Sequence, residues 1–422
     1  MKKLSILTLT LIAMGLFVAS CDKDDDPIMD PIDKYNPIVL DCDYLKTDRT
    51  LSLNPDSDVD YLVTCWMNVE GHIKVEPGVV IEFEEKAGIN VEESSNAQIS
   101  FAAVGTSNNP IIFKGKESRK GYWTGIQYLD ASSPNNELKN VVIQDAGYER
   151  YFSHDAGAVI VKGNDVTNLK ISNTAFRNNK NYGLNVDVSK VYLNEFKNNS
   201  FAQNDVPIRT HPNNLGALDK TTSYTGNVND YIFINSYSTS IDRNLTWHKV
   251  DVPYLLEADF AASHGGLGIF ADVVMEAGVE VIMTKDSKIT VGHFGQDGSL
   301  AMNGTEDDEI IIRGEEATPG YWEHIRFANN DAKNKMSYVK LMDAGKTDVS
   351  STNDPNGVLL VDIHRVDGLV LDIDNITFEN SVDFAINIRD EYIDKADFQY
   401  SNLNFGTPRE FGDFDNNPIL NP

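Results

Sequence analysis

The chain has 422 residues, of which 24% are charged, and a formal net charge of −28 at pH 7. So acidic a surface repels phosphate backbones and anionic headgroups, which excludes nucleic acid and argues against anionic lipid surfaces as partners. The carboxylates can attract Ca²⁺ loosely. No acidic run has the glycine and the ligand spacing of a calcium loop, so we expect no metal site and no cofactor.

The N-terminus is typical of an export signal. Lys2 and Lys3 precede an apolar run over residues 4–18 that is short for a membrane span. The run ends in "VASC" at 18–21, which resembles the lipobox of bacterial lipoproteins. This resemblance implies that residues 1–20 are removed and that Cys21 carries the lipid. The alternative is an ordinary secretory signal that ends near a cysteine.

Residues 21–36 are acidic and proline-containing, and they cannot bury apolar area, so we expect a flexible tether. An acidic stretch directly after a lipidated cysteine is similar to the export signal of some Gram-negative surface lipoproteins. The resemblance implies an outer membrane lipoprotein that faces the cell exterior and is held by its lipid anchor. No later stretch of the sequence is long and apolar enough to span a membrane.

Two cysteines, Cys42 and Cys65, follow the lipidation site. Export to an oxidising compartment favours a disulfide between them. Their spacing alone does not show that the two Cα atoms come within bridging distance, so the pairing stays open at this point.

A long internal duplication organises the rest of the chain. Segments of the first half recur in the same order in the second half: "PGVVIEF" as "AGVEVIM", "GTSNNPIIFKG" as "GTEDDEIIIRG", "GYW" as "GYW", "NVVIQDAG" as "YVKLMDAG" and "GAVIV" as "GVLLV". A repeat of this length predicts two units, 37–230 and 231–422, that are stacked or continuous with one another.

Each unit consists of short strand-like runs of Val, Ile and Phe that alternate with polar residues and end at Gly, Asn, Asp or Pro. A shorter echo lies inside the first unit, where "AFRNNKNYG" at 175–183 resembles "EFKNNSFAQ" at 195–203. Asparagine at the corner of a coil tolerates a left-handed bend and can hydrogen-bond its amide to the next coil. The echo predicts a solenoid with a coil of twenty-odd residues, in which Phe176 and Phe196 are equivalent.

With these motifs the sequence resembles the right-handed parallel β-helix proteins, which are pectin lyase-like in fold, and more closely their secreted or lipid-anchored bacterial members. The matching segments are Glu76–Phe83, Pro110–Gly115, Gly121–Ile126 and Phe176–Gly183. The resemblance implies an all-β, internally duplicated right-handed solenoid. It implies little about activity, because this fold serves enzymes, adhesins and inert scaffolds alike.

The repeated Gly-Tyr-Trp predicts a structural role. Gly121 and Gly320 are expected to allow a turn between coils, and Trp123 and Trp322 to pack against the coil wall. Stacking of a ligand on these two indoles is the alternative.

The sequence contains none of the catalytic motifs that we would expect of an enzyme with this fold. The carboxylate and basic motifs of β-helix polysaccharide hydrolases are missing, as are a Gly-x-Ser-x-Gly elbow and a phosphate-binding loop. His154 and Asp155 could form an acid–base pair, but a loop histidine is the simpler interpretation. The sequence therefore favours a non-catalytic protein and leaves enzyme activity open.

Aromatic loop residues are the candidates for a binding site. They are Tyr148, Tyr151, Phe152 and His154 in one loop, and Trp247 and Tyr254 at a second place. From these we expect a cell-surface protein that binds glycan or another surface protein through the faces and loops of the solenoid. The alternatives are a polysaccharide lyase or glycoside hydrolase of the same fold, and a structural or adhesive rod.

Overall fold

The structure is a computed structural model. It describes residues 34–93, 99–149, 156–235, 239–257, 266–292, 297–345, 356–362, 370–389, 398–414 and 418–419. Cys21 and the tether up to residue 33 lie outside this range. The chain divides into two units, Met1–Lys34 and Tyr35–Pro422, and all described strands belong to the second.

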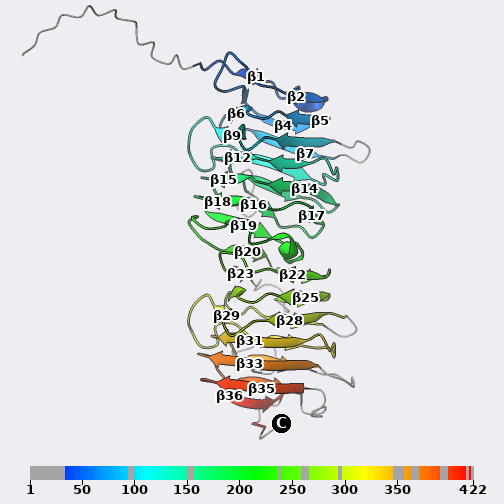
Figure 1. The fold of residues 1–422 in the computed structure, drawn as a ribbon, viewed down its shortest axis with the longest axis vertical. Helices are drawn as coiled ribbons and strands as arrows, with labels where there is room; N and C mark the ends of the chain where they lie inside the picture. Colours follow the sequence, from blue (N-terminus) through cyan, green and yellow to red (C-terminus); the bar gives the residue numbers. More distant parts are fainter. Residues whose placement is uncertain are drawn as a thin grey trace, which may run out of the picture. The chain divides into compact units, whose positions relative to one another are not determined.

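Four parallel sheets make up this second unit (Figure 1). Sheet A contains β1 (Ile38–Leu40), β3 (Tyr61–Val63), β6 (Val80–Phe83), β9 (Ile111–Gly115), β12 (Val141–Gln144), β15 (Ala175–Arg177) and β18 (Ser200–Ala202). Sheet B contains β2 (Arg49–Leu51), β5 (His72–Val75), β8 (Ser100–Val104), β11 (Glu137–Lys139), β14 (Thr167–Ser172) and β17 (Val191–Leu193).

Sheet C begins in the first repeat with β4 (Trp66–Val69), β7 (Gly88–Glu92), β10 (Gly125–Leu129), β13 (Val159–Lys162), β16 (Tyr182–Val186) and β19 (Val206–Thr210). It continues with β20 (Ile232–Asn235), β22 (Leu245–Trp247), β23 (Tyr254–Glu257), β25 (Asp272–Met275), β26 (Glu280–Met283), β28 (Ser299–Asn303), β29 (Ile310–Gly314), β31 (Lys335–Met342), β33 (Leu371–Glu379) and β35 (Phe398–Phe405). Sheet D contains β21 (Ser240–Ile241), β24 (Leu267–Ile269), β27 (Ile289–Val291), β30 (Ile325–Phe327), β32 (Leu359–Val361), β34 (Phe384–Ile388) and β36 (Arg409–Asp413).

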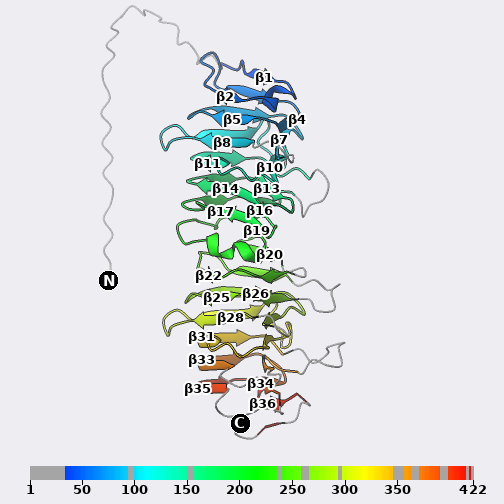
Figure 2. The ribbon, with the colours of Figure 1, turned by 90° about the vertical axis from the view of Figure 1, so that its right-hand side faces the viewer.

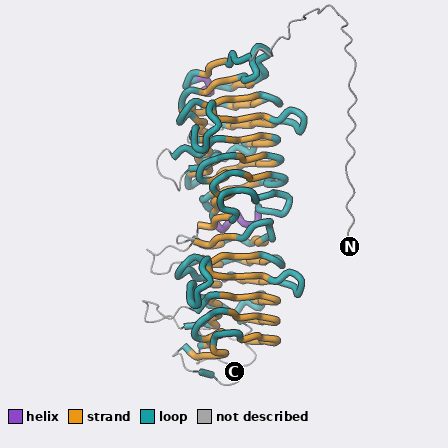
Figure 3. The backbone as a smooth tube through the Cα atoms, turned by 90° about the vertical axis from the view of Figure 1, so that its left-hand side faces the viewer, coloured by secondary structure: helices purple, strands orange, loops and turns teal. Residues whose placement is uncertain are grey.

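The chain visits the sheets in turn and so winds as a solenoid. In the first repeat β6 of sheet A is followed by β7 of sheet C, β8 of sheet B and then β9, which pairs in parallel with β6. Figure 3 shows the strands of successive coils lying over one another, with loops at the corners. The prediction of an all-β parallel solenoid is therefore confirmed, and the right-handed winding stays a prediction. Among the described residues no helix could cross a bilayer.

Alternation of apolar and polar residues explains why these segments are strands. In β9 every second side chain, beginning with Ile111, is buried, and the side chains between them are partly exposed. Parallel pairing in register then places similar side chains of successive coils over one another. Phe176 lies beside Phe201 in register, and their rings stack with centroids 4.5 Å apart.

A buried asparagine ladder marks one corner. Asn179 Nδ2 donates to Asn204 Oδ1 at 2.8 Å, and Asn204 Nδ2 donates to Asn227 Oδ1 at 2.9 Å. Each amide also donates to a carbonyl of the preceding coil, as Asn204 does to Phe176 O at 3.0 Å. The ladder confirms that asparagines connect coils.

The coil length is that expected, but the equivalence of Phe176 and Phe196 is wrong, because Phe176 pairs in register with Phe201. Asn179 meets Asn204, 25 residues on, whereas Asn199 belongs to another corner and binds Ile171 O. The two Asn-Asn pairs resemble each other because both corners need a left-handed residue, supplied by Asn178 at φ 51° and Asn198 at φ 53°. The resemblance thus reflects a shared turn and not a shared position in the stack.

The two Gly-Tyr-Trp segments have the same structural role. Gly121 (φ +69°) and Gly320 (φ +74°) adopt left-handed turns that favour glycine. Trp123 and Trp322 follow and are fully buried. Each indole Nε1 donates to a backbone carbonyl of the next coil, that of Gln144 at 2.8 Å and that of Met342 at 2.7 Å. The structural prediction is confirmed, because neither ring is open to a ligand.

The two repeats share sheet C but contribute different faces to it. β19 pairs with β20, and β20 pairs with β23. The segment "GVVIEF" forms β6 in sheet A, whereas its counterpart "GVEVIM" forms β26 in sheet C. The 3₁₀ helix η3 (Pro212–Ala217) lies where sheet B would gain a strand after β17, and it contacts β17, β21 and β22. The second repeat is therefore shifted by one face, and the boundary at residues 230/231 stays a prediction.

Candidate functional site

The aromatic residues nominated from the sequence do not form a site in the described part of the chain. Tyr151, Phe152 and His154 lie outside the described residues. Tyr148 is half-buried, with Lys86 Nζ 5.3 Å from its ring centroid. This single contact gives no ligand-binding surface.

The predicted ligand-binding role of Trp247 and Tyr254 has to be corrected. Trp247 is fully buried and Tyr254 is 1% exposed, and their rings pack edge to face at 5.5 Å inside the core. In β22 the chain alternation points the third residue, Trp247, inward. Tyr254 Oη donates to His248 O at 2.7 Å, which satisfies its only polar atom. Neither ring can stack on a sugar, so this part of the hypothesis is wrong.

Cys42 and Cys65 form a disulfide with Cα atoms 5.9 Å apart. Cys42 lies just before the 3₁₀ helix η1 (Tyr44–Lys46), and Cys65 directly precedes β4. The bond therefore joins the first coil to the start of sheet C. Its place in the first coil indicates a structural role.

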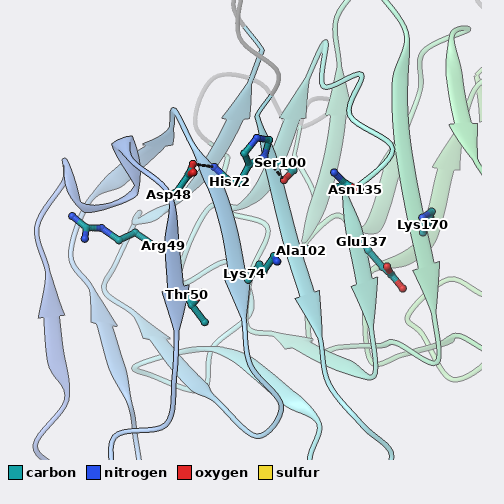
Figure 4. Close-up of a pocket in the computed structure, with 10 residues that line it drawn as sticks. All are labelled: Asp48, Arg49, Thr50, His72, Lys74, Ser100, Ala102, Asn135, Glu137 and Lys170. Atoms are coloured by element: carbon teal, nitrogen blue, oxygen red, sulfur yellow. Dashed lines mark hydrogen bonds between the residues drawn. The ribbon is translucent and has the colours of Figure 1, made fainter.

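An open groove of about 640 Å³ lies on the outer face of sheet B (Figure 4). Figure 2 shows the strands β5, β8, β11, β14 and β17 of this sheet following one another down the stack. Five side chains form one row across it, because their residues are paired in register on successive strands: Thr50, Lys74, Ala102, Glu137 and Lys170. Each alternates with buried neighbours, such as Ile73 and Val75 beside Lys74, so the row faces solvent.

Polar groups surround this row. Arg49, His72, Ser100 and Asn135 also line the groove, and Asp48 lies at its end. His72 Nδ1 is 3.0 Å from Ser100 Oγ, and the His72 backbone N–H donates to Asp48 Oδ1 at 2.8 Å. The groove therefore presents hydroxyl, amide and imidazole groups together with charges of both signs.

The two lysines of the row have no ion-pair partner among the described residues, although the chain is strongly acidic. Some lysines elsewhere are paired with carboxylates, as Lys120 is with Asp205 at 2.7 Å and Lys249 with Asp308 at 2.7 Å. Lys74 and Lys170 lie three strand steps apart, about 14 Å at the usual strand spacing. The lining of the groove thus carries three basic side chains, Arg49, Lys74 and Lys170, against two acidic ones, Asp48 and Glu137.

The second repeat shows that the fold does not require this row. In "DVVMEAG", the counterpart of "HIKVEPG", Asp272 replaces His72 and Val274 replaces Lys74. By the same register Lys335 replaces Glu137, and Asp372 replaces Lys170. Asp272 is moreover paired with Lys333 at 2.8 Å, which lowers the pKa of that carboxyl. Both repeats form the corresponding strands, in sheet B and in sheet C, so strand formation does not depend on the charges of the first repeat.

Sequence reasoning missed every residue of the groove. Its members are separated by whole coils of unequal length and form no motif. The signal that could have revealed them is a charged residue between two buried aliphatic residues on consecutive strands, as in "HIKV" and "NLKI". In the described part of the chain no group of three or more His, Cys, Asp and Glu side chains is placed to hold a metal ion.

No protein-family model matches the chain, and searches of curated proteins and of solved structures give no significant match. Function therefore has to be inferred from the geometry of this chain alone.

Proposed function

We propose that the protein is a non-catalytic cell-surface binding protein that holds an extended acidic glycan across the outer face of sheet B. The observation that carries this proposal is that two lysines in one row of the groove, Lys74 and Lys170, have no ion-pair partner among the described residues. Lysine without a protein carboxylate attracts the carboxylate or sulfate groups of a ligand. The row runs along the stack, which suits a linear polymer better than a compact small molecule.

The net charge of the chain does not oppose such a ligand at the groove. Charges farther away than about 8–10 Å are largely screened at physiological salt. A sugar in the groove therefore experiences mainly the groove's own charges, which are those of Lys74, Lys170, Arg49, Glu137 and Asp48. Ser100, Asn135 and Thr50 supply hydrogen-bonding groups of the kind that recognise sugar hydroxyls.

Geometry supports binding over cleavage in this groove. Glycoside hydrolysis uses two carboxyl groups about 5–9.5 Å apart. The groove carboxylates are Asp48 and Glu137, which lie about three strand steps apart, or roughly 14 Å. Asp48 is in addition hydrogen-bonded to the His72 backbone. We therefore assign the groove to binding.

The place of binding is part of the proposal and depends on residues 1–36. The "VASC" sequence and the acidic segment after it support a lipid anchor at Cys21 and an outer membrane lipoprotein exposed to the exterior. The winding of a right-handed, pectin lyase-like β-helix belongs to the same set of expectations. Metabolic labelling with a fatty acid, compared between the wild type and Cys21→Ser, tests the anchor directly.

An array of linear glycans tests the groove. Residues 22–422 should bind acidic members such as heparin, hyaluronan and alginate, and a neutral polymer such as dextran should bind less. The double variant Lys74→Gln/Lys170→Gln should lose about tenfold or more in affinity, since each charge-assisted contact is worth about 1.5–3 kcal/mol at most.

Lys335→Gln is the matched control, because Lys335 is an exposed lysine on the corresponding row of the second repeat. It should bind like the wild type. Equal binding by the double variant and the control would refute the proposal, and depolymerisation of a bound glycan would replace it with the enzyme alternative.

A further inference from the structure

One exposed aromatic residue lies next to the groove on the same face of sheet B. Tyr192 is 47% exposed and occupies the middle of β17, where its neighbours Val191 and Leu193 point inward. It is paired in register with Asn168 of β14, two residues before Lys170. The ring therefore continues the polar face by one strand beyond the lysine that ends the groove.

Arg243 holds this ring from another part of the chain. Its guanidinium carbon lies 5.4 Å from the centroid of the Tyr192 ring. The guanidinium is itself anchored, because Nη1 donates to Val191 O at 3.5 Å and Nη2 donates to Ser189 O. An exposed tyrosine fixed in this way presents a flat apolar surface that loses little conformational freedom when a ligand covers it.

Amides connect the ring to the groove. Asn168 Nδ2 donates to Ser132 O at 2.6 Å, and its Oδ1 accepts from Asn194 Nδ2 at 3.2 Å. The surface between Lys170 and Tyr192 is thus polar, and hydrogen bonds hold its amide groups in place.

We infer that Tyr192 is a stacking subsite that receives a sugar ring of the same glycan and so sets the length of ligand that binds best. The inference rests on the proposed function of the groove. From Lys74 on β5 to Tyr192 on β17 there are four strand steps, about 19 Å. A linear glycan that lies along the stack places about one ring per strand, so a chain of about five sugars reaches from one end to the other. The aromatic face stacks on the C–H face of a pyranose, which needs no charge and no metal.

The test measures affinity against ligand length with residues 22–422. Size-defined hyaluronan and heparin oligosaccharides, from disaccharide to decasaccharide, are titrated by calorimetry. We expect affinity to rise with length until the chain covers about five to six sugars and then to level off. Tyr192→Ala should weaken the long oligosaccharides roughly three- to tenfold and remove the last rise, whereas Tyr192→Phe should keep it.

Arg243→Gln is a second variant, and it separates positioning from stacking. It should reduce the same last rise only in part, because the ring remains but is less well held. Folding of every variant is checked by circular dichroism and thermal unfolding.

The outcomes distinguish the two proposals. If long oligosaccharides bind Tyr192→Ala as tightly as the wild type while Lys74→Gln/Lys170→Gln loses binding, the subsite is overturned and the groove stands. If the rise of affinity with ligand length is the same in Tyr192→Ala as in the wild type, the subsite is likewise overturned. If neither oligosaccharide series binds the wild type, both proposals fail together.

Discussion

His211 should make the stability of the join between the two repeats depend on pH. It precedes η3, and its Nδ1 accepts a hydrogen bond from the Asn213 backbone N–H at 3.2 Å. Burial lowers the pKa of His211 from the ordinary 6.5 to about 4, with a smaller opposing effect of Asp242. The folded protein therefore keeps this imidazole neutral, as an acceptor, in mildly acidic solution where the unfolded chain protonates it.

The sign and size follow from proton linkage. Above pH 6.5 both states are neutral and the full stability is present. As the pH falls towards 4, only the unfolded state binds the proton, so stability is lost across that window. A difference of this size corresponds to a total loss of about 3 kcal/mol, of which about 2 kcal/mol is lost by about pH 5.

Urea unfolding followed by circular dichroism at about pH 7.5 and about pH 5 measures the loss. His211→Asn is the matched variant, because asparagine also accepts a hydrogen bond at a helix N-cap but does not titrate. The wild type should lose about 2 kcal/mol more than His211→Asn between the two pH values. The same loss in both proteins would show that the imidazole is not held neutral at the join.

Three further changes probe the scaffold by equilibrium unfolding. Trp123→Ala should cost about 3–5 kcal/mol, because it leaves a cavity beside Phe83, with which Trp123 stacks at 3.9 Å; an effect below about 1 kcal/mol would contradict the buried position. Asn204→Ala should cost about 1–3 kcal/mol, since Phe176 O then loses its donor, and Asn204→Asp should not restore it. Replacing Cys42 and Cys65 by serine should cost about 3 kcal/mol for a loop closed across 23 residues, and adding a reductant to the wild type should reproduce that loss.

The sequence was sufficient to predict the architecture because the architecture is repetitive. The buried face of a strand such as β9 can be recognised from the alternation of apolar and polar residues alone. The matching segments of the two halves indicate that the same series of coils occurs twice. Parallel stacking then follows, because equivalent short strands of successive coils pair edge to edge and turn their apolar faces into one common interior. Trp123 and Trp322 could be assigned to the structure on the same ground.

Register was harder to predict than architecture. Corners repeat more visibly than faces, because a left-handed turn accepts few residue types, while a buried row accepts Val, Ile, Leu and Phe alike. Asn198 therefore resembled Asn178 although Asn204 is the residue stacked on Asn179. Unequal loops between strands hide the true spacing further.

The groove was missed for a related physical reason. Residues on one face of a solenoid come together across coils, so Lys74 and Lys170 line one groove although they belong to distant parts of the chain. The binding site predicted from the sequence was instead based on aromatic residues. One of them, Trp247, is a core residue, because its side chain in β22 points inward. An isolated aromatic residue in a β-rich sequence is weak evidence of a site unless its face is known.

Comparison of the two repeats separates what the fold needs from what it merely permits. Buried positions keep their apolar character in both, as Ile73 and Val273 do, because a polar residue there would lie unpaired in the core. The outer row differs at every charged position, from Lys74 to Val274 and from Lys170 to Asp372. In the second repeat Lys333 pairs with Asp272 across that surface, whereas Lys335 of the corresponding row has, like Lys74 and Lys170, no ion-pair partner among the described residues. The row of the first repeat differs in carrying two lysines, Lys74 and Lys170, without an ion-pair partner among the described residues, and the proposed acidic ligand would supply the negative charge that they lack.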